Sequence, residues 1–392
     1  MRIVVAPSGF KESLGADEVA DCSEAGVLKV VPEAEVLKAP MVDGGEGFTK
    51  ALVVATDGSL REIEVTGPVG RPVASHYGFL GGDGPRTAVL EMAAAAGLVL
   101  VPREVRDPSG TTTYGVGELI WAALDEGAEK LLVGCGDSGT TDGGAGMAQA
   151  LGVRLLDAKG EELGRGGIEL ARLASIDLSG RDRRLDGVRV DVACNWHNLL
   201  CGPRGVARVF GPQKGASPEQ VERLAGGLEN FADVVERDLG VDVREAPGCG
   251  ASGGLGAGLS ALLGATLHPR YDIISRYLEV ESLIEGSDLV FTAEGGIDFQ
   301  TPRGKIPAEI AGRAKKFGVP VVAIVGTVGK GAGINHDYGI DAYVSILQEP
   351  CSLEDAIERA PELVELCAED VTRLVMVGRG LAGPLNENVA VG

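Results

Sequence analysis

The sequence has few basic residues for its size. Its 36 Lys and Arg stand against 57 Asp and Glu, which gives a formal net charge of −21 over 392 residues. Binding nucleic acid without sequence preference requires a basic surface that displaces counterions, and docking on anionic lipid requires the same kind of surface. The shortage of cations therefore argues against nucleic-acid and membrane partners. An anionic substrate would have to be bound by a few local cations.

Paired cysteines and long apolar runs are also missing. The seven cysteines include no Cys-x-x-Cys pair, and an odd number of cysteines without a secretion signal suits free thiols in a reducing cytosol. The opening residues, MRIVVAPSGFK, lack the longer apolar region and the cleavage site of a signal peptide. No apolar stretch reaches the roughly 20 residues that span a bilayer. We therefore expect a soluble cytoplasmic protein.

Several common enzyme signatures are absent. The sequence contains no Walker A motif and no HRD and DFG pair of a protein kinase. These absences remove the commonest ATP-binding families. They do not exclude phosphoryl transfer itself.

Short apolar, β-branched runs alternate with segments of helical periodicity along the whole chain. This alternation predicts an α/β architecture with a largely parallel sheet. The expected strands include 2–6, 131–133, 288–292, 321–325 and 341–346. Ser217, Pro218 and Gln220 form a capping box that predicts a helix to about Leu239. The region 67–285 is richer in irregular glycine segments than either end and is interpreted as a separate domain.

Two glycine-rich segments near the start carry charges that a bare turn does not need. Lys11 lies between an expected strand and an expected helix, at the mouth of that helix. Helix N-termini bind anions, and Lys11 would add a full positive charge. Asp43 and Glu46 stand among three glycines. They suit Mg²⁺, which binds through one or two carboxylates plus phosphate and water, although an acidic turn is the alternative.

The glycine-rich segment after the strand at 131–133 has two interpretations. Gly134, Gly136 and Gly139 spell Gly-x-Gly-x-x-Gly, and Asp157 lies about where a dinucleotide-binding fold places its ribose-binding acid. This pattern is typical of an NAD-dependent dehydrogenase. In the dinucleotide fingerprint, however, the helix starts within the motif, and this loop continues beyond it.

The longer loop favours the second interpretation, a phosphate-binding cradle. The hydroxyl groups of Ser138 and Thr140 would line it, and Asp142 would face a metal ion. Gly253 and Gly254 belong to a further candidate phosphate nest before another expected helix. Close helix packing through small residues is the alternative for that second segment.

Two later segments combine charged and amide side chains. Residues 194–217 carry the amides of Asn195 and Asn198 and the cations of Arg204 and Lys214, in a protein short of cations. The segment 292–307 directly follows an expected strand and contains two carboxylates and two polar residues: Glu294, Asp298, Gln300 and Lys305. Open α/β sheets bind ligands at the carboxyl ends of their strands.

Taken together, these segments resemble the bacterial class I glycerate kinases, also called glycerate 2-kinases. The resemblance runs in unbroken order from residue 1 to about 385 through FKESL, DGGEG, EMAAAAGL, SxTxDGGAGM, FGPQKGA, PGxGAxGGLG and EGxxDxQTxxGK. It implies phosphorylation of the 2-hydroxyl group of D-glycerate by ATP and Mg²⁺. It also implies a flavodoxin-like domain (1–66 and 286–392) and an inserted α/β, restriction-enzyme-like domain (67–285), with the active site in the cleft.

Phosphoryl transfer depends mainly on positioning and charge neutralisation, which predicts a role for each polar segment. Asp298 is expected to be the general base, with Glu294 as second choice, and Lys11, Lys214 and Lys305 would offset developing charge. The residues expected to bind nucleotide phosphates are Gly136, Ser138, Thr140, Gly143, Gly144, Lys214, Gly253 and Gly254. The expected acceptor-binding residues are Ser8, Asn195, Asn198, Arg204 and Gln300. The expected metal ligands are Asp43, Glu46 and Asp142.

The chain departs from the family pattern inside these loops. It has Ser8-Gly9 where the family usually has Asp-Ser, Asn195 in place of an aspartate and Gly296 in place of an arginine. Another small hydroxy acid or alcohol is therefore an alternative acceptor. A dehydrogenase and a non-catalytic ligand-binding homologue are the alternatives to a kinase, and a homodimer stays open.

Overall fold

The computed structural model describes the backbone of residues 1–10 and 13–385. These residues form two compact units: the described residues up to Val42 and from Leu278 onward make one, and Asp43–Tyr277 makes the other. The first unit is therefore discontinuous in sequence, and the second is a single stretch of chain. No helix of the described part is long and apolar enough to cross a membrane.

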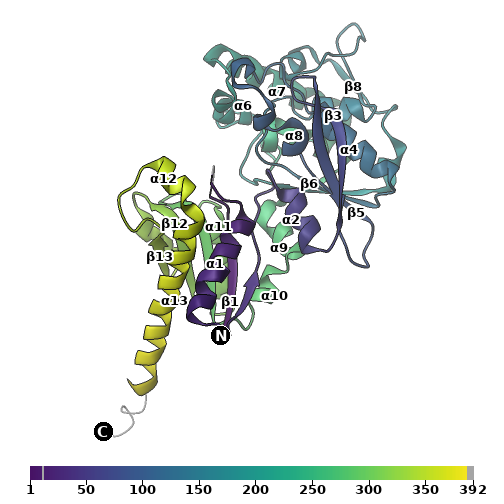
Figure 1. The fold of residues 1–392 in the computed structure, drawn as a ribbon. Helices are drawn as coiled ribbons and strands as arrows, with labels where there is room; N and C mark the ends of the chain where they lie inside the picture. Colours follow the sequence, from purple (N-terminus) through teal and green to yellow (C-terminus); the bar gives the residue numbers. More distant parts are fainter. Residues whose placement is uncertain (11–12, 386–392) are drawn as a thin grey trace. The chain divides into compact units, whose positions relative to one another are not determined.

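The discontinuous unit is built on a five-stranded parallel sheet (Figure 1). Its strands lie in the order β13-β12-β11-β1-β2. Counted along the chain within this unit, that order is 2-1-3-4-5, the order of flavodoxin-like folds. The strands are β1 (Arg2–Pro7), β2 (Glu35–Lys38), β11 (Leu289–Ile297), β12 (Val321–Val328) and β13 (Ala342–Ser345). The predicted α/β class and the flavodoxin-like parallel sheet are confirmed.

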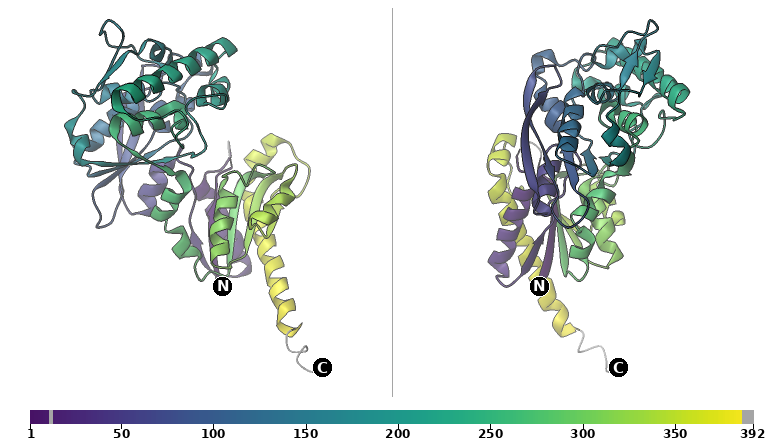
Figure 2. Two further views of the ribbon diagram at one scale, coloured as in Figure 1. Left: turned by 180° about the vertical axis from the view of Figure 1, so that it is seen from behind. Right: turned by 90° about the vertical axis from the view of Figure 1, so that its right-hand side faces the viewer.

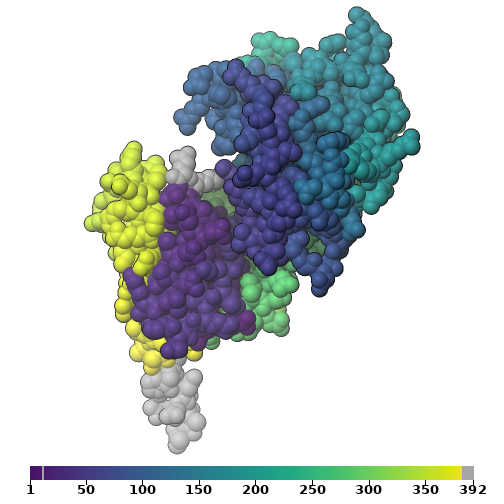
Figure 3. Space-filling model, turned by 45° about the vertical axis from the view of Figure 1, so that its right-hand side comes forward, coloured from purple at the N-terminus to yellow at the C-terminus, as the bar shows by residue number. Residues whose placement is uncertain are grey.

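Helices cover both faces of this sheet, as a parallel sheet requires (Figure 2). α1 (Ala16–Val30) and α13 (Ala360–Leu385) pack together on one face, and their surfaces adjoin in the space-filling view (Figure 3). A Cβ atom at Gly26 would overlap the α13 backbone, so the two helices approach closely there. α11 (Ile306–Lys316) covers the opposite face. The shorter helices of the unit are α10 (Val280–Ile284) and α12 (Leu353–Glu358).

The continuous unit contains a six-stranded mixed sheet in the order β10-β9-β6-β5-β4-β3. β3 and β4 form an antiparallel hairpin at one side, and the other four strands run parallel. The strands are β3 (Ser59–Thr66), β4 (Pro72–Phe79), β5 (Thr87–Glu91), β6 (Lys130–Gly134), β9 (Arg189–Cys194) and β10 (Thr266–Pro269). A separate two-stranded sheet pairs β7 (Arg154–Leu156) with β8 (Ser175–Asp177).

Two buried apolar clusters hold this unit together, one around the six-stranded sheet and one around α7 and α8. The helices are α2 (Phe48–Ala55), α3 (Ala93–Ala96), α4 (Tyr114–Asp125), α5 (Ala145–Ala150), α6 (Val206–Phe210), α7 (Pro218–Leu239), α8 (Ala251–Leu263) and α9 (Arg270–Tyr277). Ser217 caps α7 as its sequence predicts: its hydroxyl accepts a bond from the Gln220 amide, and the Gln220 side chain accepts one from the Ser217 amide.

The chain passes from one compact unit to the other at 42/43 and at 277/278. Both boundaries lie earlier in the chain than the predicted ones at 66/67 and 285/286. Residues 43–66 belong to the continuous unit because β3 pairs with β4 along its whole length and α2 packs on β4 and β5. Residues 278–285 belong to the discontinuous unit because α10 packs on β1 and α11. Strand pairing and helix packing decide these boundaries, and neither is visible in the glycine content on which the prediction rested.

Candidate active site

The parallel strands of the continuous unit all deliver polar segments to one edge of their sheet. β5 ends at Glu91, β6 at Gly134, β9 at Cys194 and β10 at Pro269. Because these strands are parallel, the segments that follow them meet at the same edge, where open α/β sheets bind ligands. The predicted phosphate cradle follows β6, and the predicted acceptor segment follows β9.

Asp142 organises the loop after β6 from inside. Its carboxylate is fully buried. One oxygen accepts hydrogen bonds from the amide and the hydroxyl group of Thr113 at 2.7 and 2.9 Å and from the Gly146 amide at 3.2 Å. The other oxygen accepts the Gly144 amide at 3.2 Å. Burial raises the pKa of Asp142, and these bonds oppose that shift. With its oxygens already bonded, Asp142 fits a loop-positioning role better than the predicted metal-binding role.

Lys214 lies beneath the same loop rather than in solvent. Its side chain comes from the turn after α6, is 3% exposed, and donates to the hydroxyl of Ser138 at 2.8 Å and to the carbonyl of Thr140 at 2.5 Å. Burial lowers the pKa of Lys214 to about 7. The nearby carboxylate of Asp142 opposes this shift. Lys214 therefore lies at the predicted loop, but it binds the buried side of the loop through Ser138 and Thr140.

The predicted nest lies at the start of α8, where the helix is kinked, and packs directly against the loop after β6. Ser252, Gly253 and Gly254 all have left-handed backbones, with φ of 52°, 70° and 90°. The Gly253 carbonyl accepts the Gly143 amide at 3.0 Å, and a Cβ atom at Gly253 would overlap the carbonyl oxygen of Thr140. The structure thus gathers most of the predicted phosphate-binding residues: Ser138, Thr140, Gly143, Gly144, Lys214, Gly253 and Gly254.

Much of this cluster is buried, so only some of its residues are accessible to a ligand. Thr140 and Thr141 are buried, and their hydroxyl oxygens have no hydrogen-bond partner among the described residues. Gly136 is partly exposed and packs on Gly45, since a Cβ atom at Gly136 would lie 2.5 Å from the Gly45 Cα. The accessible part of the loop is accordingly Gly136 and its exposed neighbour Asp137.

The loop 43–47 forms an acidic rim beside Gly136. Asp43 accepts the Gly45 amide at 3.1 Å, and the exposed Glu46 donates its amide to a carboxylate oxygen of Asp137 at 3.1 Å. Arg270, at the start of α9, lies 3.5 Å from the Asp43 carboxylate. Within residues 1–10 and 13–385, no group of three or more His, Cys, Asp or Glu side chains is placed to hold a metal ion.

Glu91, at the end of β5, anchors this rim. Its buried carboxylate accepts the Gly47 amide at 3.0 Å and the Thr49 amide at 2.7 Å, at the N-terminus of α2. Burial raises its pKa, whereas these amides lower it. A carboxylate at a helix N-terminus is favoured by the exposed amides there. Glu91 therefore fixes the position of the loop that carries Asp43 and Glu46.

The predicted acceptor segment begins with a tight turn after β9. The Asn195 side chain accepts the His197 amide at 3.1 Å, and the Asn195 carbonyl accepts the Asn198 amide at 3.2 Å. The Asn198 carbonyl accepts the Gly250 amide at 3.0 Å, which joins this turn to the start of α8. Arg204 follows on the surface. Asn195 is thus held by its own turn and remains half-buried.

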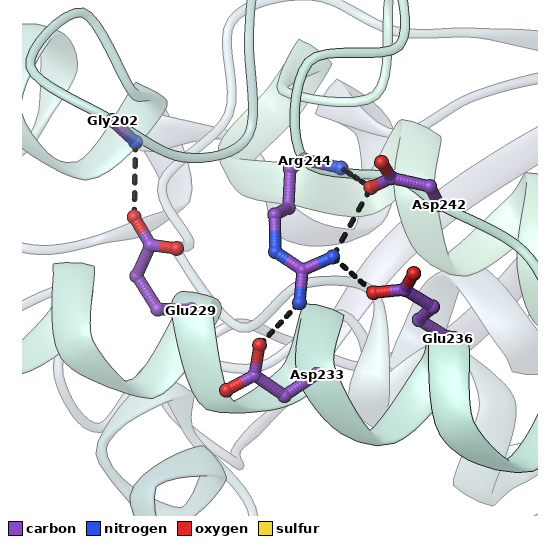
Figure 4. A network of polar contacts seen from close by, with 6 residues as sticks. All are labelled: Gly202, Glu229, Asp233, Glu236, Asp242 and Arg244. Atoms are coloured by element: carbon purple, nitrogen blue, oxygen red, sulfur yellow. Dashed lines mark hydrogen bonds and ion pairs between the residues drawn. The ribbon is translucent and has the colours of Figure 1, made fainter.

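A charged network around Arg244 holds the end of this segment (Figure 4). The Arg244 guanidinium pairs with Asp233 and Glu236 of α7 and with Asp242, while its carbonyl accepts the amides of residues 200 and 201. Glu229, also on α7, accepts the Gly202 amide at 3.0 Å. The turn 200–202 is therefore bound to α7 from two sides.

The discontinuous unit carries a second polar group, at the end of β11. Glu294 lies 3.5 Å from the ammonium group of Lys305, which also donates to the Gly296 carbonyl at 3.3 Å. The strand β11 continues to Ile297, beyond the predicted end at Thr292, so Glu294 and Gly296 are strand residues. Asp298 is the first residue after the strand.

Asp298 is held by its own loop. Its amide donates to the Thr301 hydroxyl at 3.1 Å, and its carboxylate accepts the amide of Gln300 at 2.8 Å. The buried Asn335 donates to its carbonyl at 3.0 Å. Ser8 lies at the end of the neighbouring strand β1 and donates its amide to Ala293 at 2.8 Å. Lys11, also predicted here, lies outside the described residues.

Three residues of these sites were missed in the sequence. Asp137 has a left-handed backbone, with φ of 49°, which is uncommon for a residue other than glycine and clusters at functional sites. Its position inside the Gly-x-Gly-x-x-Gly run was the available signal. Glu91 opens the segment EMAAAAGL, and Arg270 directly follows a strand. The sequence alone does not indicate which loop Glu91 or Arg270 contacts.

The dehydrogenase alternative is not favoured. Asp157 accepts the Lys159 and Glu161 amides and pairs with Arg172, so its carboxylate closes a turn next to β7. These bonds lower its pKa. The helix α5 starts at Ala145, after the glycine motif rather than within it. The loop therefore lacks the geometry of the dinucleotide fingerprint.

Comparisons with known proteins point to one family. The family model described as the glycerate kinase family matches residues 3–376. The chain is 48% identical to a glycerate kinase of Bacillus subtilis, over 97% of this chain and 99% of the relative. It is 45% identical to a glycerate 2-kinase of Escherichia coli, over 98% and 100%. A crystal structure of a glycerate kinase 2 from Salmonella typhimurium LT2 matches with a TM-score of 0.84 and 46% identity, over 97% of this chain and 99% of that chain.

Proposed function

The chain belongs to the glycerate kinase family, and we propose that it transfers the γ-phosphoryl group of ATP to the 2-hydroxyl group of D-glycerate, giving 2-phosphoglycerate. The relative from Escherichia coli that is named glycerate 2-kinase supports the choice of the 2-hydroxyl. The observation that carries the proposal is the glycine-rich cluster at the carboxyl end of β6, in which Lys214 supports a loop of backbone amides and hydroxyl groups.

The cluster suits a polyphosphate for electrostatic reasons. Phosphoryl transfer needs donors and positive charge around the phosphate oxygens more than it needs covalent chemistry. Lys214 would contribute its charge through the loop rather than by direct contact, because it is buried and two of its three N–H donors bind Ser138 and Thr140. A bound phosphate would favour the charged form of the lysine, whose pKa is lowered to about 7 by burial.

Mg²⁺ is the metal we propose for this reaction, held by Asp43 and Asp137. A Cβ atom at Gly45 would overlap one oxygen of Asp137 and lie 3.1 Å from an oxygen of Asp43. The two carboxylates therefore border one small space beside a residue without a side chain. Carboxylate oxygens are the usual protein ligands of Mg²⁺, with phosphate and water completing its shell. Bound there, Mg²⁺ would neutralise charge on the phosphate oxygens.

We assign the proton transfer to Asp298. Its carboxylate is partly exposed, and its loop is fixed by Thr301 and Asn335. A general base must be held where it can accept the proton of the acceptor hydroxyl. Glu294 is the second choice because Lys305 already neutralises it. The lysine would offset charge on the transferred group.

We propose Ser8, Asn195, Asn198, Arg204 and Gln300 as acceptor-binding residues. Amide side chains suit hydroxyl groups, and an arginine suits a carboxylate. Asn195 is neutral where the family pattern has an acid, so a different small hydroxy acid or alcohol is the alternative acceptor.

The direct test is a coupled assay of ADP release with ATP, Mg²⁺ and a panel of small hydroxy acids. We expect the highest kcat/KM for D-glycerate, and ³¹P NMR of the product should place the phosphate on carbon 2. The control variant is Asp337→Asn, which changes an exposed aspartate in the discontinuous unit, the unit that contains Asp298. ADP release with no glycerate product, or phosphate on carbon 3, would overturn the assignment.

We also propose a cytoplasmic location and a small-molecule substrate as the principal partner. The seven cysteines are free, and five of them are buried. Free thiols are typical of reducing compartments. Fractionation of cells that express the tagged protein tests the location.

A further inference from the structure

Arg270 places a positive charge at the edge of the sheet that carries the acidic rim. β10 ends at Pro269, which pairs with Cys194 at the end of β9, and α9 begins at Arg270. The guanidinium group lies over the ring of the buried Tyr271, 4.6 Å from its centre. The side chain of Arg270 is 19% exposed. Arg270 is therefore held within the continuous unit, at the same edge as the loop after β6.

The helix itself does not favour a cation at this position. The amides of a first helical turn make that end partly positive, which suits the acid Asp272 of the same turn better than an arginine. A contact that does favour the charge is the one with Asp43. A terminal nitrogen of Arg270 lies 3.5 Å from the carbonyl oxygen of Asp43 and 3.5 Å from its carboxylate.

The two carboxylate oxygens of Asp43 face different neighbours. Oδ2 is the oxygen near Arg270. Oδ1 accepts the Gly45 amide at 3.1 Å and borders the small space that Asp43 shares with Asp137. Arg270 and a metal ion in that space would therefore share one carboxylate. Two cations on one carboxylate repel each other, so each weakens the binding of the other.

The pair between Arg270 and Asp43 is loose. Charge-assisted bonds between nitrogen and oxygen are typically about 2.7–2.9 Å long, and this contact is 3.5 Å with an Asp43 side chain that is 44% exposed. Exposed pairs of this kind contribute little to stability. A guanidinium group offers a planar fork of donors that matches phosphate oxygens. A phosphate beside the metal is therefore a stronger partner for Arg270 than Asp43 is.

We propose that Arg270 pairs with Asp43 in the unliganded protein and binds a phosphate oxygen of the nucleotide once Mg²⁺ binds Asp43. This inference rests on the proposed kinase function and adds a phosphate-binding residue to it. Phosphate is the anion within reach, because phosphate oxygens complete the shell of a magnesium ion that carboxylates hold. The exchange keeps the charge of Asp43 compensated in both states.

The test uses Arg270→Gln, with Arg270→Lys as the second variant. Glutamine removes the charge, whereas lysine keeps the charge without the planar fork. The matched control is Arg276→Gln, which changes an exposed arginine of the same helix. Urea unfolding of each variant checks that it is folded.

Two binding measurements need no turnover. Electron paramagnetic resonance follows Mn²⁺, which prefers the same oxygen ligands as Mg²⁺, in protein without nucleotide. Calorimetry follows ATP at saturating Mg²⁺, without an acceptor. Steady-state kinetics add the KM for glycerate.

We expect Arg270→Gln to bind Mn²⁺ about threefold more tightly, because the repulsion between two cations on one carboxylate is gone. The same variant should bind ATP about tenfold more weakly, because a charge-assisted bond is lost. Arg270→Lys should keep the wild-type affinity for Mn²⁺ and lose less affinity for ATP. Arg276→Gln should match the wild type in both measurements.

The opposite signs of the two shifts are the signature of the exchange. A residue that only shaped the loop would weaken the binding of both probes. The proposal is overturned if Arg270→Gln binds both probes as the wild type does, or binds both more weakly. It is also overturned if this variant raises the KM for glycerate and leaves ATP binding unchanged, since Arg270 would then bind the acceptor carboxylate.

These outcomes are distinguishable from failure of the kinase assignment. Opposite shifts in a protein that releases no ADP with any hydroxy acid support the role of Arg270 and refute the kinase. An active wild type with unaffected Arg270 variants refutes only the role of Arg270. A wild type that binds neither Mn²⁺ nor ATP refutes both.

Discussion

The ammonium group of Lys214 donates a hydrogen bond to the hydroxyl group of Ser138 over 2.8 Å, beneath the loop that follows β6. Burial lowers the pKa of this lysine to about 7, whereas an unfolded chain keeps the ordinary value near 10.5. Between these values the unfolded chain binds one proton more than the folded protein. The free energy of unfolding contributed by Lys214 must therefore rise with pH, by at most about 1.4 kcal/mol per pH unit.

We predict that Lys214→Met removes this rise. Methionine keeps an unbranched apolar side chain but carries no proton, so the variant's stability has no contribution from this group. Urea unfolding of both proteins at several pH values between 7 and 8.5 measures the difference. The other titrating groups are common to both proteins, so their contributions cancel in the comparison. Parallel pH dependences would show that Lys214 keeps an ordinary pKa.

Asp142 and Asp137 lie on the same loop, but the same substitution to asparagine is predicted to lower the unfolding free energy at Asp142 and to leave it nearly unchanged at Asp137. Asp142→Asn places an amide donor where Thr113, Gly144 and Gly146 all donate. Leaving buried donors unsatisfied costs about 1–3 kcal/mol each, so the unfolding free energy should fall by that order. Asp137→Asn changes an exposed side chain, and asparagine tolerates a left-handed backbone.

Asp137→Asn should therefore leave stability within about 0.5 kcal/mol of the wild type. It should instead raise the Mg²⁺ concentration that gives half-maximal activity, because it removes a proposed ligand. Urea unfolding and a magnesium titration of ADP release separate the two effects. A magnesium dependence equal to that of the wild type would remove Asp137 from the metal site.

The sequence predicted best what depends on local chemistry. The capping box at Ser217 and the end of α7 at Leu239 were both predicted from a few adjacent residues, and the structure has both. The glycine-rich segments were recognisable because left-handed backbone favours glycine. The alternation of apolar strands and helices predicted the α/β class, because the periodicity of each element depends on residues that are close together in the sequence.

What the sequence did not predict depends on distant partners. Lys214 and Ser138 are 76 positions apart, so nothing near Lys214 indicated that its side chain is buried. The strand β11 continues through two glycines, which ordinarily weaken a strand, because β12 pairs with it as far as Val328. The acidic residue at 142 suggested a metal ligand until its four hydrogen-bond donors were known.

The contact between the loop after β6 and the start of α8 allows a prediction for a glycine substitution. Gly253→Ala adds a methyl group that overlaps the Thr140 carbonyl, at a left-handed position with φ of 70°. Gly240→Ala is the matched control: its φ is 71°, and no atom lies within 4 Å of the added group. Backbone strain alone costs about 1–2 kcal/mol and is common to both variants.

Gly253→Ala should therefore lose more unfolding free energy than Gly240→Ala, and only Gly253→Ala should raise the KM for ATP. Thermal unfolding and steady-state kinetics of the two variants provide the comparison. If both variants lost stability equally and kept the wild-type KM, the close approach of the two segments would have no role in nucleotide binding.

Asp298→Asn tests the proton transfer with little disturbance of the loop. Asparagine retains a side-chain oxygen that can accept the amide of Gln300 at 2.8 Å, so the local turn should persist. A general base contributes about 10²–10⁴-fold to the rate. We expect kcat to fall within that range while the KM values for ATP and glycerate change little, since the lost interaction is confined to the transition state.

Glu294→Gln distinguishes the two carboxylates. It leaves Lys305 without the partner that lies 3.5 Å away, so it should change the KM values as well as kcat by altering the charge beside the transferred group. Steady-state kinetics of both variants, with Asp337→Asn as the control, measure this split. A larger loss of kcat in Glu294→Gln than in Asp298→Asn would exchange their roles, because the base is the group whose removal most reduces the rate at saturating substrate.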